Sequence, residues 1–178
     1  MAQLSRSTCL QTSAQLSFAK SRSLFGLYYT DGSKKGKYPT SQCHSATIDE
    51  NNRTVYRLKL YGLNDIYSAE LSAIWFTLKK IKNKIIDMNK LNDQNIKNFI
   101  IVTDSLSAIN KIESTYYKNI HNFFLININL LLAEFETLNI IITIIWTPSH
   151  IGIKGNELAD QVAKNNNIIP HHTSTYKP

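Results

Sequence analysis

The order in which hydrophobic patterns follow one another is the feature that most constrains the fold of this chain. Three strand-like runs come first, at residues 24–30, 42–48 and 54–60, and polar turn residues separate them. Two later runs, at residues 99–103 and 140–146, are continuously apolar, as in strands that are buried on both faces. Helical periodicity lies between these later runs. The pattern predicts an α/β protein with a mixed sheet, antiparallel first and parallel later, covered by helices.

Four stretches are predicted to be helical. The first starts near Ala69, and its apolar residues recur every three or four positions with lysines on the opposite face. The second follows Ser105, which can cap it. The third and fourth cover residues 121–138 and 157–164. The segment 83–98 is rich in asparagine and lysine, so we expect an exposed connection there.

A length of 178 residues with 43% hydrophobic content suits one domain with a sizeable core. We expect this domain to span residues 24–165. Residues 1–23 contain many serines and three basic residues but no acidic one, which is typical of a disordered tail or, as the less favoured alternative, an organelle transit peptide. Residues 166–178 are expected to form a second disordered tail.

The net charge of +7 favours a polyanionic partner, because lysines and arginines that neutralise phosphates release counterions. The two cysteines, Cys9 and Cys43, are too few for a disulfide framework and lack the spacing of a zinc site. We therefore expect an intracellular location, in the nucleus or cytoplasm, with mitochondrial import as the alternative. No apolar run approaches the roughly 20 residues of a membrane span, so no membrane partner is expected.

Acidic residues stand where the predicted elements meet one edge of the sheet. Asp31 ends the first strand, Asp104 ends the fourth, and Glu70 opens the first helix. Ligands of open sheets bind beyond the carboxyl ends of parallel strands, so these side chains are expected to converge, with Asp160 joining from the last helix. Carboxylates gathered in this way repel one another unless a cation compensates. Oxygen ligands suit Mg²⁺ or Mn²⁺. Two such metal ions about 3.5–4 Å apart can activate water and stabilise a leaving oxygen.

Each acid taken alone also has a purely structural interpretation. Asp31 precedes a glycine and suits a turn, and Glu70 suits the positive end of a helix dipole. Asp104 suits a cap, and Asp160 suits a solvent-facing helix position. Four such coincidences in one motif order are improbable, so the joint interpretation as a functional site is preferred.

Four stretches resemble type 1 ribonuclease H, most closely the ribonuclease H domains of non-LTR retrotransposon polyproteins. They are residues 29–33 (YTDGS), 68–71 (SAEL), 102–108 (VTDSLSA) and 146–160 (WTPSHIGIKGNELAD). The last is the most specific, and all four appear in the family's order. The resemblance implies a ribonuclease H-like fold, with a five-stranded mixed sheet of three antiparallel strands followed by two parallel ones and helices on both faces.

The resemblance also implies an endoribonuclease that hydrolyses the RNA strand of RNA/DNA hybrids with two metal ions, leaving 5′-phosphate and 3′-hydroxyl ends. The ions would be Mg²⁺, with Mn²⁺ as the alternative. The residues that match the family's metal-binding carboxylates are Asp31, Glu70, Asp104 and Asp160. His150 matches a mobile-loop histidine that assists catalysis, with an ordinary surface histidine as the alternative. The candidate substrate contacts are Gly32, Ser33, Ser105 and Asn156, although Asn156 can equally cap the last helix.

Other functions remain open at this level. A catalytically impaired ribonuclease H-like module, left from a retrotransposon, would bind nucleic acid without cutting it, and retention of all four acids disfavours this reading. A DNA strand transferase or resolvase on the same fold is disfavoured by the order of the acids. A reverse transcriptase domain normally accompanies this module in retrotransposons, so such a domain of a parent polyprotein is an expected partner. The chain itself is expected to act as a monomer.

The basic residues divide into two groups. Lys79, Lys80, Lys82 and Lys84 are interpreted as the solvated back of the first helix rather than as a phosphate-tracking face. The lysines at positions 34, 35 and 37 follow Asp31 closely, so phosphate contact is more plausible there. Residues 111–122 lack the basic handle with which some family members grip the hybrid.

Overall fold

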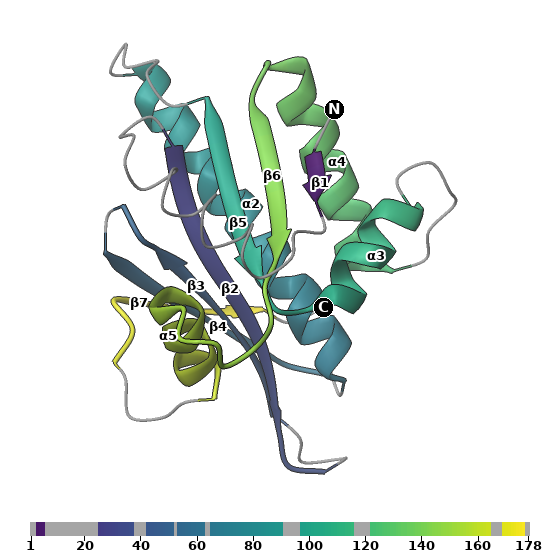
Figure 1. Ribbon diagram of the computed structural model, residues 1–178, viewed down its shortest axis with the longest axis vertical. Coiled ribbons are helices and arrows are strands. Elements are labelled where there is room, and N and C mark those ends of the chain that lie inside the picture. The colour runs from purple at the N-terminus through teal and green to yellow at the C-terminus, as the bar shows by residue number, and fades with distance from the viewer. Residues whose placement is uncertain are drawn as a thin grey trace.

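A mixed sheet with helices on both faces organises the protein (Figure 1). The computed structural model describes residues 3–5, 25–37, 42–51, 53–62, 65–90, 97–115, 122–164 and 169–176. The antiparallel meander consists of β2 (Phe25–Lys35), β3 (Gln42–Asp49) and β4 (Thr54–Leu60). The parallel part consists of β5 (Asn98–Thr103), which pairs with β2, and β6 (Ile141–Trp146), which pairs with β5. The predicted ribonuclease H-like arrangement is confirmed.

Within the residues that the structure describes, two short edge strands extend the sheet to seven strands, in the order β1-β6-β5-β2-β3-β4-β7. β1 (Gln3–Ser5) pairs in parallel with β6, and β7 (His172–Tyr176) pairs in parallel with β4. The sheet therefore has more than the five expected strands, and the two additional strands lie in the segments expected to form tails. An unpaired sheet edge offers backbone groups to any extended segment, whatever its side-chain pattern, so periodicity could not reveal these strands.

The helix α2 (Ile66–Lys90) is longer than expected at both ends. It begins before Ala69 because Asp65 Oδ1 accepts a hydrogen bond from the backbone N–H of Ser68 at 2.6 Å, which caps the first turn. We expected an exposed connection over residues 83–98, and this prediction is wrong for residues 83–90, which belong to α2. Ile85 is buried against the core, so tertiary packing sustains the last turns.

The described residues form two hydrophobic cores, which lie on opposite faces of the sheet. The helices α2, α3 (Leu106–Thr115) and α4 (Phe123–Thr137) cover one face, and α5 (Lys154–Ala163) covers the other (Figure 1). Side chains alternate along β2, so Tyr28 joins the larger core beneath α2 and Tyr29 joins the smaller core beneath α5. By the same alternation, the side chain of Asp31 lies on the face of the sheet that α5 covers, and Gly32 lies on the face that α2 covers. Within the described chain, none of the helices has the length and hydrophobicity to span a membrane.

Candidate active site

The carboxylates of Asp31, Glu70 and Asp104 converge, and one oxygen from each lies within 4.8 Å of the others. Asp31 lies in β2 and Asp104 directly follows β5. These two strands are parallel neighbours, with Thr30 opposite Thr103, so the next residue of each reaches the same level of the sheet. The structure therefore brings these three predicted acids together.

A close approach of α2 to β2 at Gly32 brings Glu70 to the other two acids. The backbone N–H of Gly32 donates a hydrogen bond to Glu70 Oε2 at 3.1 Å. A Cβ atom at Gly32 would lie 2.4 Å from the backbone nitrogen of Glu70 and 2.6 Å from the carbonyl carbon of Ala69. Only a residue without a side chain fits here, so Gly32 sets the distance between strand and helix, in addition to any substrate contact.

Asp160 borders this cluster from α5. Its Oδ1 atom pairs with Lys164 Nζ at 2.5 Å. Its negative charge raises the pKa of both Asp31 and Glu70, which places it on the same side of the molecule. Among the described residues, the group whose oxygens lie within 4.8 Å contains the other three acids and not Asp160. The fourth predicted acid therefore adjoins the cluster rather than completing it.

The acidic cluster fits a hard divalent cation. Burial raises the pKa of Asp31 to about 8, with the negative charges of Asp104 and Asp160 adding to the rise. Burial likewise raises the pKa of Glu70 to about 9, with Asp31 and Asp104 contributing. Asp31 Oδ2 is buried without a hydrogen-bond partner in the described structure. A cation would satisfy this oxygen and offset the repulsion, and an all-oxygen ligand set suits Mg²⁺ or Mn²⁺.

The stability of the cation-free protein is expected to fall as pH rises. Asp31 and Glu70 bind protons more tightly in the folded chain than in the unfolded chain, since their folded pKa values are raised to about 8 and about 9. The stability linked to them is thus present below an ordinary carboxyl pKa of about 4 and is lost progressively up to the raised values. Thermal unfolding in chelator between about pH 5 and about pH 8 measures this slope. Asp31→Asn or added Mg²⁺ should flatten it, and an equal slope in Asp31→Asn would contradict the explanation.

The turn between β6 and α5 lies against the same acids. Ser149 Oγ donates a hydrogen bond to Asp104 Oδ2 at 2.7 Å. The adjacent His150 is exposed and adopts a left-handed φ of 58°. Its side chain makes no hydrogen bond or ion pair with the three acids in the described structure. Sequence reasoning missed Ser149, although the hydroxyl directly before His150 in the most specific motif was a usable signal.

The other candidate substrate contacts have structural roles of their own. Ser33 is buried, and its hydroxyl donates to the carbonyl oxygen of Ala163, which ties the end of α5 to β2. Ser105 precedes α3, and its backbone N–H donates to Thr103 Oγ1 at 3.2 Å. Asn156 lies inside α5, whose N-cap is Ile153, so the capping interpretation of Asn156 is wrong. Asn156 is buried, and its Oδ1 atom has no partner among the described groups.

The lysines of α2 contact neighbouring side chains. Lys79 Nζ lies 4.7 Å from the ring centre of Trp75, and Lys80 Nζ lies 4.4 Å from that of Tyr56. Lys82 Nζ lies 2.7 Å from both carboxylate oxygens of Glu134. Each ammonium thus already has an aromatic or acidic partner within the protein. These contacts favour the interpretation of the lysines as the back of the helix over that of a phosphate-tracking face.

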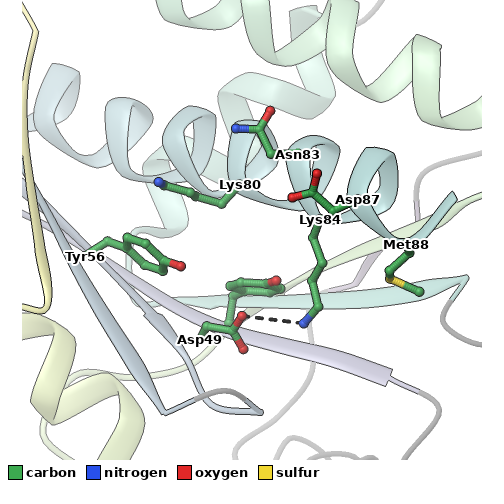
Figure 2. A pocket seen from close by; sticks show the side chains of 8 residues that line it. Asp49, Tyr56, Lys80, Asn83, Lys84, Asp87 and Met88 are labelled. Carbon is green, nitrogen blue, oxygen red and sulfur yellow. Dashed lines mark ion pairs between the residues drawn. The ribbon is translucent and has the colours of Figure 1, made fainter. Parts of the chain in front are cut away.

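Lys84 borders a cavity of about 410 Å³ between the second half of α2 and the sheet (Figure 2). Lys84 Nζ lies 3.5 Å from Asp49 Oδ2, and the charges of Lys80 and Lys84 are matched by those of Asp49 and Asp87. Lys80 follows Glu70 by ten positions, which is about 15 Å along a helix. The cavity is therefore separate from the acidic cluster.

The strand order and the acidic cluster beside β2 and β5 define the chain as a protein of the ribonuclease H-like fold. The sequence profile of the RNase H family matches residues 26–168, which is most of the chain. The chain therefore belongs to the RNase H family and is an enzyme of the ribonuclease H class.

Solved structures share this fold. RNase H1 of the archaeon Halobacterium salinarum is 14% identical with a TM-score of 0.51, over 79% of this chain and 96% of that chain. The N-terminal RNase H domain of a Mycobacterium tuberculosis protein is 15% identical with a TM-score of 0.50, over 79% and 97% of the two chains. The foamy viral protease-reverse transcriptase in complex with an RNA/DNA hybrid is 22% identical with a TM-score of 0.54, over 79% of this chain and 19% of that chain. A search of curated protein sequences gives no match.

Proposed function

We propose that this chain hydrolyses the RNA strand of RNA/DNA hybrids by two-metal-ion catalysis, leaving 5′-phosphate and 3′-hydroxyl ends. The observation that carries the proposal is the convergence of Asp31, Glu70 and Asp104 within 4.8 Å in a chain of the RNase H family. The raised pKa values of Asp31 and Glu70 support a site built for a cation, because the folded chain tolerates these charges poorly without one.

The three converging carboxylates would hold the ions, with Asp160 as a further ligand at the border. When bound, Mg²⁺ or Mn²⁺ supplies an activated water and stabilises the charge that develops on the phosphate. The chain's own residues keep the carboxylates in place. Gly32 donates to Glu70, and Trp146 Nε1 donates to the backbone oxygen of Asp104 at 3.1 Å. Such preorganisation lowers the cost of reaching the transition state.

The proposed substrate and partner follow from charge and likeness. The net charge of +7 favours a phosphate-rich ligand. The foamy viral neighbour was solved with an RNA/DNA hybrid, and this chain spans 19% of that neighbour's length. We therefore propose that an RNA/DNA hybrid is the substrate and that a reverse transcriptase domain of a parent retroelement polyprotein is a partner. The predicted nuclear or cytoplasmic location and monomeric state stay predictions.

The direct test is cleavage of a labelled RNA/DNA hybrid by the purified chain with Mg²⁺, with Mn²⁺ and with chelator. We expect cutting of the RNA strand alone, and only with a divalent cation. Duplex DNA and branched DNA serve as parallel substrates. Tight binding of the hybrid without cutting would favour the catalytically impaired module, and cutting or joining of branched DNA would favour a resolvase or strand transferase.

His150→Ala is expected to slow turnover by about 10²-fold without eliminating it, which is the lower end of the range for a positioned acid–base group. The expectation rests on the position of His150 in the turn that Ser149 attaches to Asp104. Single-turnover cleavage of the hybrid measures the effect. Ile151→Ala, in the same turn and also exposed, is the control for disturbance of the turn itself. An unchanged rate in His150→Ala would identify it as an ordinary surface histidine.

A further inference from the structure

The turn between β6 and α5 reaches the acidic cluster through the side chain of Ser149. Ser149 is exposed, and its hydroxyl donates to Asp104 Oδ2 at 2.7 Å. The two residues are 45 positions apart, so the bond joins two separate elements of the fold. Because the acceptor is a carboxylate, the hydrogen bond is charge-assisted and stronger than one between neutral groups.

The turn has further attachments at both of its ends. At the start, the backbone N–H of Thr147 donates to the carbonyl oxygen of Thr103 at 3.0 Å. At the finish, the backbone N–H of Gly152 donates to Glu157 Oε1 at 3.0 Å. These bonds attach the turn to β5 and to α5. Among the described residues of this turn, Ser149 provides the side-chain hydrogen bond to the clustered carboxylates.

The conformation of His150 depends on such attachments. Its φ of 58° lies in the left-handed region, which is unfavourable for a residue with a side chain. A strained backbone of this kind persists only where its surroundings hold it. The Ser149 bond to Asp104 and the Gly152 bond to Glu157 flank His150 on its two sides. Loss of the first bond would allow the turn to relax and His150 to move.

The same bond orients the carboxylate of Asp104. While Oδ2 accepts the hydroxyl of Ser149, rotation of the carboxylate is restricted and Oδ1 remains free of that bond. Hydrogen bonds to ligating carboxylates tune metal affinity, and their removal typically weakens it about 10- to 100-fold. Ser149 therefore acts on both the cation ligand and the histidine that follows it.

We propose that Ser149 is a positioning residue that couples cation binding at Asp104 to the placement of His150. The inference deepens the proposed function and rests on its cation site. Removal of the hydroxyl weakens cation binding and also removes the benefit of His150. A threonine at this position keeps the hydroxyl and preserves both effects.

The first arm of the test measures Mn²⁺ binding by calorimetry without nucleic acid. Ser149→Ala is expected to raise the Kd for Mn²⁺ about tenfold, and Ser149→Thr is expected to restore it. The control is Ser114→Ala on α3, whose hydroxyl donates to the carbonyl oxygen of Lys111 and lies outside the cluster. An unchanged Kd in Ser149→Ala, or no Mn²⁺ binding by the unaltered chain, overturns the inference.

The second arm combines Ser149→Ala with His150→Ala in single-turnover cleavage of the hybrid. Coupled residues give a double variant no slower than the slower single variant, whereas independent effects multiply. If the slowing in the double variant equals the product of the slowing in the two single variants, the proposed coupling is overturned. If the unaltered chain binds Mn²⁺ but does not cut the hybrid, the proposed function fails. The calorimetric arm then still decides whether Ser149 positions the cation ligand.

Discussion

Asp104→Asn is expected to abolish cleavage of the hybrid while leaving the fold intact. Asp104 contributes one of the three carboxylates that lie within 4.8 Å, and asparagine keeps its size but not its charge. Stabilisation of developing charge by a bound cation contributes several kcal/mol, and each 1.4 kcal/mol is tenfold in rate, so the loss is about a thousandfold or more. Single-turnover cleavage and Mn²⁺ calorimetry measure the two consequences.

The matched control is Asp87→Asn, which removes a carboxylate on the exposed side of α2, beside Lys90 and away from the cluster. This control should cut as fast as the unaltered chain. Asp104→Asn should also be at least as stable without cations, because one source of repulsion toward Asp31 and Glu70 is gone. Full cleavage by Asp104→Asn would remove the basis for the two-metal proposal.

Gly32→Ala is expected to damage both the fold and the site. The added Cβ would lie 2.4 Å from the backbone nitrogen of Glu70, and backbone atoms cannot rotate away as a flexible side chain can. The strand and α2 would have to separate, at a cost of about 1–3 kcal/mol. The shift would also move Glu70 away from Asp31, and a displacement of about 1 Å in an active site can slow the reaction about 10²-fold.

Thermal unfolding, together with cleavage by the fraction that remains folded, separates these two effects. Gly152→Ala is the control for the stability measurement, because its Cβ would meet nothing within 4 Å although its φ is +84°. It should cost only the left-handed strain of about 1–2 kcal/mol. A Gly32→Ala variant that is as stable and as active as the unaltered chain would mean that α2 and β2 can separate without cost.

Most of the fold could be predicted because its central elements carry strong local patterns. Hydrophobic periodicity predicts the strands β2 to β6 from their alternating or continuous apolar runs, and it predicts the start of α2 from its amphipathic pattern. The two edge strands are short and lack such a pattern. The five residues of β7, for example, read HTSTY and are mostly polar. Tertiary packing positions β7 instead, since the ring centres of Tyr176 in β7 and Trp75 in α2 are 5.4 Å apart. The last turns of α2 also depend on distant partners, such as Asp49 for Lys84.

The candidate site divides in the same way. The meeting of Asp31 and Asp104 follows from adjacent parallel strands, which the order of elements already implies. The hydroxyl of Ser149 in the most specific motif marked it as a candidate, but its bond to Asp104 depends on how the turn after β6 packs against the end of β5, which the sequence does not show. The close packing of α2 at Gly32 likewise depends on two elements that are separate in the chain.

The sequence by itself determined the class of fold and the family, and it marked the four acids as candidates, because these depend on local periodicity and on short motifs in a fixed order. Only the tertiary structure decided how closely the acids meet, which of them lies at the border and what holds them. The reason is physical. Distances between elements depend on packing at single points such as Gly32 and on long-range bonds such as that of Ser149, and neither leaves a periodic trace in the chain.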